Sequence, residues 1–179
     1  MEHIEILARA INPPMGGTYE PPSVDDWNRF EATFTKVPLD FKLLLSRFGS
    51  GRIDGFVTLF NPAAKNPYTN FFEQVPRALE VLVELSHDAG EHLQLGVWPL
   101  PGGLFPFGCT ENGDFLCWKT QGVPEEWQVV VGGGRDPAWI FFPGGAVEFL
   151  AEVLRGRFAC PLFPEDFPSR DFGDVAPSN

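Results

Sequence analysis

The chain has three cysteines and three histidines, and their spacing limits the chemistry that they can do. A cysteine nucleophile needs an accessible thiolate with a base beside it. Cys109 is predicted on the buried face of a strand and Cys117 on a more open face, so Cys117 is the thiol to test if an activity is found. Cys109, Cys117 and Cys160 are an odd number of cysteines, and the chain has no evident export signal. Both features favour reduced thiols over disulfides.

The histidines and glycines match no pattern of a known site. His87 and His92 are five residues apart with Gly90 between them, so they lack the i, i+4 spacing of a helical metal site. Three glycines within residues 49–55 are followed by no Lys-Ser/Thr pair and therefore match no phosphate-binding loop. We expect the histidines to be ordinary surface residues.

Two pairs of adjacent carboxylates are the remaining candidates for acid–base or metal chemistry. Asp25-Asp26 and Glu125-Glu126 are expected in exposed segments, and the sequence positions no third ligand beside either pair. The sequence therefore predicts no metal, no cofactor and no catalytic residue, and it argues against an enzyme.

The charge of the chain restricts its partners. The 179 residues carry a formal net charge of −11, whereas nucleic acid or an anionic membrane would require a basic footprint. A basic protein would be attracted, although an acidic surface can also serve solubility alone. No apolar run approaches the roughly 18 residues that span a bilayer, so we expect a soluble, unexported, cytoplasmic protein. The oligomeric state is left open.

Residues 103–120 are predicted to form a β-hairpin around Asn112-Gly113, because Asn-Gly is the strongest short signal for a two-residue turn. In that register Cys109 pairs with Leu116, and paired residues share a face. One face is then almost entirely apolar, with Phe105, Phe107, Cys109, Leu116 and Trp118. Cys109 and Cys117 point to opposite faces and are not expected to form a disulfide.

The other elements follow from apolar periodicity and turn residues. Helices are expected over residues 23–34, 38–48, 69–89 (with Pro76 as an alternative start) and 146–155, and strands over residues 56–60, 127–131 and 138–142. Residues 1–10 could begin a helix or lie as a loose arm. This order predicts an α+β fold with a mostly antiparallel sheet of about five or six strands, N-terminal helices, a C-terminal helix, and helices mainly on one face.

Domain organisation is expected to be simple. Residues 1–158 form one domain that begins with an arm and loop over residues 1–22. Residues 159–179 form a tail rich in proline and phenylalanine, and its phenylalanines suggest that it lies against the domain for some distance.

Three segments resemble the Smi/Knr type of the SUKH superfamily. They are VPLDFKLLLSRFGSG, GGLFPFGCTENGDFLCW and WIFFPGGAVEFLAEVLRG, and the resemblance extends over about residues 23–158. Val37-Pro38 departs from the usual Leu-Pro at a packing position. The resemblance implies a non-catalytic binding domain, because many members are similar to immunity proteins that neutralise polymorphic or contact-dependent toxins, and a few eukaryotic relatives act in cell-wall regulation. The family gives no catalytic residues to transfer to this chain. On the physical interpretation of the hairpin and its neighbours, the recurrent positions serve the fold; here they are Gly49, Phe107, Gly108, Gly113, Asp114 and Trp118.

A basic toxin domain, such as a nuclease, is therefore the expected partner. Acidic residues in turns, with an aromatic anchor beside them, would meet such a surface. The candidate contact residues are Asp54, Glu111, Asp114, Glu125, Glu126, Trp127 and Asp136. The alternatives are a small-ligand or regulatory domain with a pocket beside the hairpin, and an enzyme that depends on Cys117.

Overall fold

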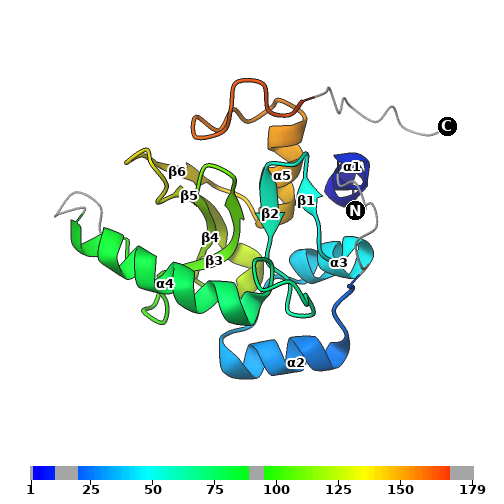
Figure 1. The fold of residues 1–179 in the computed structure, drawn as a ribbon, viewed down its shortest axis with the longest axis vertical. Helices are drawn as coiled ribbons and strands as arrows, with labels where there is room; N and C mark the ends of the chain where they lie inside the picture. Colours follow the sequence, from blue (N-terminus) through cyan, green and yellow to red (C-terminus); the bar gives the residue numbers. More distant parts are fainter. Residues whose placement is uncertain (1, 11–19, 89–94, 170–179) are drawn as a thin grey trace.

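The computed structural model describes residues 2–10, 20–88 and 95–169 (Figure 1). The helices are α1 (Glu2–Ala10), α2 (Val24–Thr33), α3 (Leu39–Phe48), α4 (Phe71–Asp88), the short 3-10 helix η2 (Pro124–Glu126) and α5 (Ala146–Leu154). The strands are β1 (Arg52–Ile53), β2 (Val57–Leu59), β3 (Leu104–Thr110), β4 (Phe115–Lys119), β5 (Gln128–Gly132) and β6 (Trp139–Phe142). This confirms the α+β class with N-terminal helices and a C-terminal helix.

The strands form one antiparallel sheet in the order β1-β2-β3-β4-β5-β6, with α4 inserted between β2 and β3. Because neighbouring strands run in opposite directions, the β1–β2, β3–β4 and β5–β6 turns lie at one end of the sheet. The β4–β5 connection lies at the other end. Figure 1 shows the three turns on the same side of the molecule as the C-terminal end of α5.

The β3–β4 hairpin differs from its predicted register by one residue. Its loop has three residues, with Gly113 at φ 91°, and Thr110 and Asp114 close it through backbone and side-chain hydrogen bonds. Cys109 therefore pairs with Phe115, on the face opposite to the one predicted. A bulge at Phe107 restores the alternation, so that Phe105 still pairs with Trp118.

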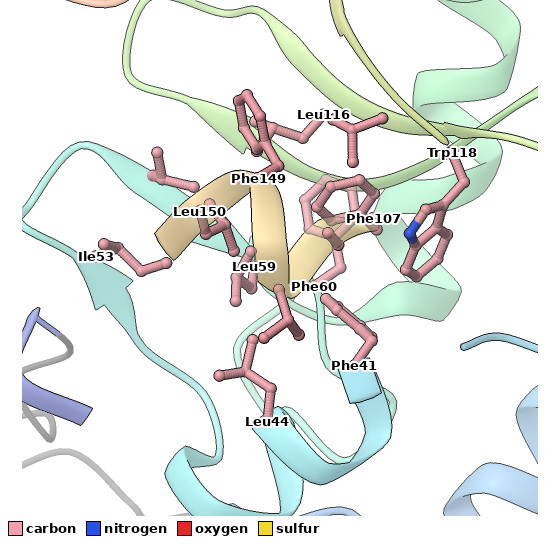
Figure 2. Close-up of a cluster of buried hydrophobic side chains, with 14 of the residues drawn as sticks. Phe41, Leu44, Ile53, Leu59, Phe60, Phe107, Leu116, Trp118, Phe149 and Leu150 are labelled. Carbon is pink, nitrogen blue, oxygen red and sulfur yellow. The ribbon is translucent and has the colours of Figure 1, made fainter. Parts of the chain in front are cut away.

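The main core lies on the sheet face that α3 and α5 cover. Figure 2 shows Phe41 and Leu44 of α3 and Phe149 of α5 gathered around side chains from the sheet. Phe41 contacts Trp118 of β4 edge-on, with 4.9 Å between ring centroids, and both side chains are fully buried. The predicted apolar stripes of these two helices thus face the predicted apolar face of the hairpin.

Local signals explain where the helices begin. Ser23 and Asp26 form a capping box at the start of α2, in which each side chain accepts a hydrogen bond from the other residue's backbone. Helix α4 begins at Phe71, so the alternative start at Pro76 is wrong, and Asn70 accepts a hydrogen bond from the Phe72 N–H instead. Pro76 falls within the helix.

The second half of α4 covers the opposite face of the sheet. Leu82 packs there in a small apolar cluster with Cys117 of β4 and Val130 of β5, all almost completely buried. The helices therefore lie mainly on one face, as predicted, with α4 extending to the other. None of the described helices is long and apolar enough to cross a bilayer.

Residues 157–169, which we call the C-terminal strap, cross the turn end of the sheet. Phe163 and Phe167 both contact the ring of Phe56, each at 5.2 Å between centroids. Ser169 donates hydrogen bonds from its backbone N–H and its hydroxyl to the Asp54 carboxylate, at 2.5 and 2.7 Å. The phenylalanines of the tail thus pack against the domain, as expected, as far as the described residues extend.

Candidate partner-binding surface

Three of the predicted contact residues lie at the turn end of the sheet. Asp54 follows β1, Glu111 lies in the β3–β4 loop and Asp136 lies between β5 and β6. The Glu111 N–H donates to the Phe56 carbonyl across the neighbouring turn. The three turns are adjacent, and we call the surface that Asp54, Glu111 and Asp136 share the acidic turn end.

These three carboxylates differ in solvent exposure and in the hydrogen bonds and ion pairs that they already form. Glu111 is half exposed and forms an ion pair with Arg52. Asp54 is partly buried and accepts the two hydrogen bonds from Ser169 of the strap. Asp136 is exposed and accepts one hydrogen bond, from the Ala138 N–H at 2.8 Å. The geometry leaves Glu111 and Asp136 as the more accessible groups.

Asp114 lies in the same region but faces inward. Only 3% of its surface is exposed, and its carboxylate accepts a hydrogen bond from the Thr110 hydroxyl at 3.1 Å. A side chain at Gly134, in the next turn, would collide with it, so the β5–β6 turn covers Asp114. Its visible role is to close the hairpin loop.

Glu125, Glu126 and Trp127 lie at the other end of the sheet, in and after η2. The two glutamates are exposed, whereas Trp127 is 5% exposed and donates from its indole N–H to the Gly122 carbonyl. Its ring contacts that of Trp118 at 5.9 Å, within the core. The predicted set therefore does not form one surface, and its aromatic member is a core residue.

Sequence reasoning missed the acidic contribution of the C-terminal strap. Glu165 and Asp166 are exposed residues of the strap, which the Phe163 and Phe167 contacts hold at the acidic turn end. The alternation of phenylalanine with acidic residues in the tail could have indicated a docked acidic segment. This pattern does not predict where on the domain the tail packs.

The comparisons with known proteins identify the family. The family model SUKH_6, described as "SMI1-KNR4 cell-wall", matches residues 25–150, from α2 into α5. The chain belongs to this SUKH family. No curated protein and no solved structure matches the chain.

The recurrent SUKH positions of the hairpin have visible structural roles. A Cβ at Gly108 would come within 2.6 Å of the Thr58 carbonyl oxygen on β2, so only glycine allows that close approach. Gly113 takes a positive φ in the loop, and Phe107 and Trp118 are fully buried. These residues position the strands and are not arranged as a reaction centre.

The three thiols of this SUKH chain are not in an activating environment. Cys117 is fully buried under α4, so the prediction that it lies on the more open face is wrong. Burial raises the pKa of Cys117 and of Cys109, and it raises the pKa of Cys160 to about 11. A cysteine nucleophile needs the opposite shift.

The described residues also provide little for a metal or a small ligand. Across residues 2–10, 20–88 and 95–169, no three His, Cys, Asp or Glu side chains are grouped so that they could hold a metal ion. The prediction of surface histidines at positions 87 and 92 is not tested, because residue 92 and the side chain of residue 87 lie outside what the structure describes. A small pocket between α4 and the sheet is lined by apolar residues and Ser86, whose hydroxyl donates to the Val83 carbonyl. It lacks the convergent polar groups that orient a ligand.

Asp40, in the first turn of α3, gives a pH-dependent prediction. Burial raises the pKa of its carboxyl group, the Phe41 N–H opposes this shift and the nearby charge of Glu125 adds to it. A carboxyl group whose pKa is higher in the folded state stabilises the protein when protonated, and this stability is lost as the pH rises through that pKa. We therefore expect Asp40→Asn to raise the free energy of unfolding at neutral pH.

Urea denaturation between neutral pH and about pH 3 measures this effect. The gain from Asp40→Asn should disappear as the pH falls and the wild-type carboxyl group becomes protonated. Asp25→Asn is the matched control, since Asp25 is an exposed carboxylate in the first turn of α2. A gain that is the same at every pH would contradict the assignment.

Proposed function

We propose that this SUKH protein is an immunity protein, a non-catalytic domain that neutralises a toxin by binding it directly. The family match over residues 25–150 carries the proposal, because the resemblance implies a binding domain of this kind. The net charge of −11 favours a basic toxin domain, such as a nuclease that holds phosphate, in the cytoplasm where such a toxin would act.

The acidic turn end is the surface that we propose for this partner. Glu111, Asp136, Glu165 and Asp166 are exposed there, on turns of the sheet and on the strap that packs against Phe56 of the β1–β2 turn. Complementary charge at the rim of an interface mainly increases the association rate and the specificity, and salt screens it. We therefore expect binding that weakens as the salt concentration rises.

The immunity role is tested by expressing this chain in bacteria together with a candidate toxin domain encoded by a neighbouring gene. The variable C-terminal domain of a large secreted protein encoded beside it is expressed with and without the chain, and growth is followed. We expect that the domain alone stops growth and that the chain restores it while binding the purified domain directly. Growth arrest that persists in the presence of the folded chain would count against the immunity role.

The surface is tested by charge reversal. Replacing Glu111 and Asp136 by lysine should weaken binding to the basic domain by about tenfold or more, mostly through slower association. Replacing Glu80 and Glu84, which are exposed on α4, by lysine changes the net charge equally and should have a much smaller effect. Binding kinetics by surface plasmon resonance at two salt concentrations separate the two variants. Equal losses would mean that net charge alone matters, and unchanged binding would place the site elsewhere.

A further inference from the structure

Strand β6 (Trp139–Phe142) forms an edge of the sheet, and among the described strands it pairs with β5 alone. An edge strand exposes a row of backbone hydrogen-bonding groups, and natural proteins protect such edges with short strands, charged residues or proline. The opposite edge is protected in this way, because β1 has two residues and its exposed Arg52 pairs with Glu111. In β6 the sequence is WIFF, without a charge or a proline.

The side chains of β6 leave apolar surface at this edge. Phe141 is 49% exposed, and Trp139 and Ile140 are partly exposed. Trp139 and Phe141 share the face that α4 partly covers, with the Trp139 ring lying against Gly132 of β5. Ile140 lies on the other face, beside the main core.

The charge around this edge indicates what kind of partner can approach it. Residues 128–147, which contain β5, β6 and the turn between them, include one arginine and one aspartate and are therefore neutral. The chain as a whole carries −11, so two copies would repel each other at most other surfaces. At β6 two copies can approach each other without that repulsion, and a basic partner finds no electrostatic attraction at this edge. A second copy of the chain is the occupant that this distribution favours.

The alternation of side chains selects one pairing register. In a continuous antiparallel sheet, directly paired residues share a face, so β6 can pair with its symmetry mate only with Ile140 opposite Ile140 or Phe141 opposite Phe141. The second register places Pro143 opposite Trp139, and proline cannot donate to the ladder. The first places Trp139 of each copy opposite Phe141 of the other, which gives two aromatic cross-strand pairs.

We propose that two copies of this protein associate through β6, around a twofold axis at Ile140, to form one continuous sheet. A twofold interface uses the same surface of both copies, and this register is self-complementary. Each copy contributes only four strand residues, so the dimer is weak and depends on concentration. The proposal is independent of the proposed function, because the acidic turn end remains outside the strand pair.

A charge exchange at position 140 tests both the association and its register. Ile140→Glu and Ile140→Lys each place like charges directly opposite each other and should abolish the dimer, whereas an equimolar mixture should restore it as a heterodimer. Leu43→Glu and Leu43→Lys are the controls, since Leu43 is 51% exposed on α3, and they should leave the dimer unchanged. Sedimentation velocity over a range of protein concentrations measures the mass, and circular dichroism confirms that each variant is folded.

Hydrogen exchange of the wild-type chain gives a second readout that needs no variant. The outward-facing amides of β6 should exchange more slowly at high than at low protein concentration. A wild-type chain that stays monomeric at millimolar concentration, single variants that still form dimers, or a mixture that stays monomeric would each overturn the proposal.

Discussion

Trp118→Ala should lower the free energy of unfolding by about 3 to 5 kcal/mol, the range for removing a large buried aromatic side chain. Trp118 is fully buried at the centre of the core. Its ring lies 4.6 Å from that of Phe107, 4.9 Å from Phe41 and 5.9 Å from Trp127, measured between centroids. The substitution removes contacts between β4, the neighbouring strand and α3 at once, and the rigid sheet cannot collapse into the space.

Trp118→Phe should cost less than half as much. The indole N–H of Trp118 is buried and has no hydrogen-bond partner among the described residues, and an unsatisfied buried donor costs roughly 1 to 3 kcal/mol. Phenylalanine removes that donor and keeps most of the apolar contact, so the two effects partly cancel. Guanidinium denaturation followed by circular dichroism measures both variants without relying on the lost fluorophore. If phenylalanine were as costly as alanine, the indole N–H would be contributing a hydrogen bond to stability.

The helices and most strands could be predicted because their signals are local. The capping box of α2 and the apolar stripe of α5 depend on residues within a few positions of one another. Strand β1 was missed because two residues give no periodicity, and it forms only because Arg52 and Ile53 pair with β2. Its existence depends on a contact rather than on its own sequence.

The hairpin register shows where local signals stopped being sufficient. Asn112-Gly113 predicted a turn correctly, but a two-residue loop competes with a three-residue loop that Thr110 and Asp114 close through their side chains. That one residue moved Cys109 to the other face of the sheet. The bulge at Phe107 then kept the aromatic face intact, so the predicted core was largely correct although the predicted loop was not.

The candidate surface was harder to predict than the fold, since turns do not reveal which end of a sheet they occupy until the strand order is known. Asp54, Glu111 and Asp136 meet because the sheet is a sequential antiparallel arrangement. The same arrangement sends Glu125 and Glu126 to the opposite end. Asp114 and Trp127 were predicted as contact residues from their residue types, but their burial depends on how the whole chain packs.

Phe163→Ala, in the C-terminal strap, is expected to lower the free energy of unfolding by about 3 kcal/mol or more. Phe163 is 8% exposed, although it lies beyond the family match at residues 25–150. Its ring contacts Phe56 and Phe167 at 5.2 Å each and Phe149 of α5 at 6.1 Å. The strap therefore joins the β1–β2 turn to α5 through one buried side chain.

The same substitution should also affect the acidic turn end. Without Phe163, the strap loses its central anchor, and hydrogen exchange over residues 157–169 should become faster. Glu165→Ala is the control, because Glu165 is exposed in the same segment and a surface change of this kind usually alters stability by less than about 0.5 kcal/mol. If Phe163→Ala unfolded at the wild-type denaturant concentration, the strap would not belong to the cooperative unit. If instead stability falls as expected, residues beyond the family match help to build both the core and the surface proposed for the partner.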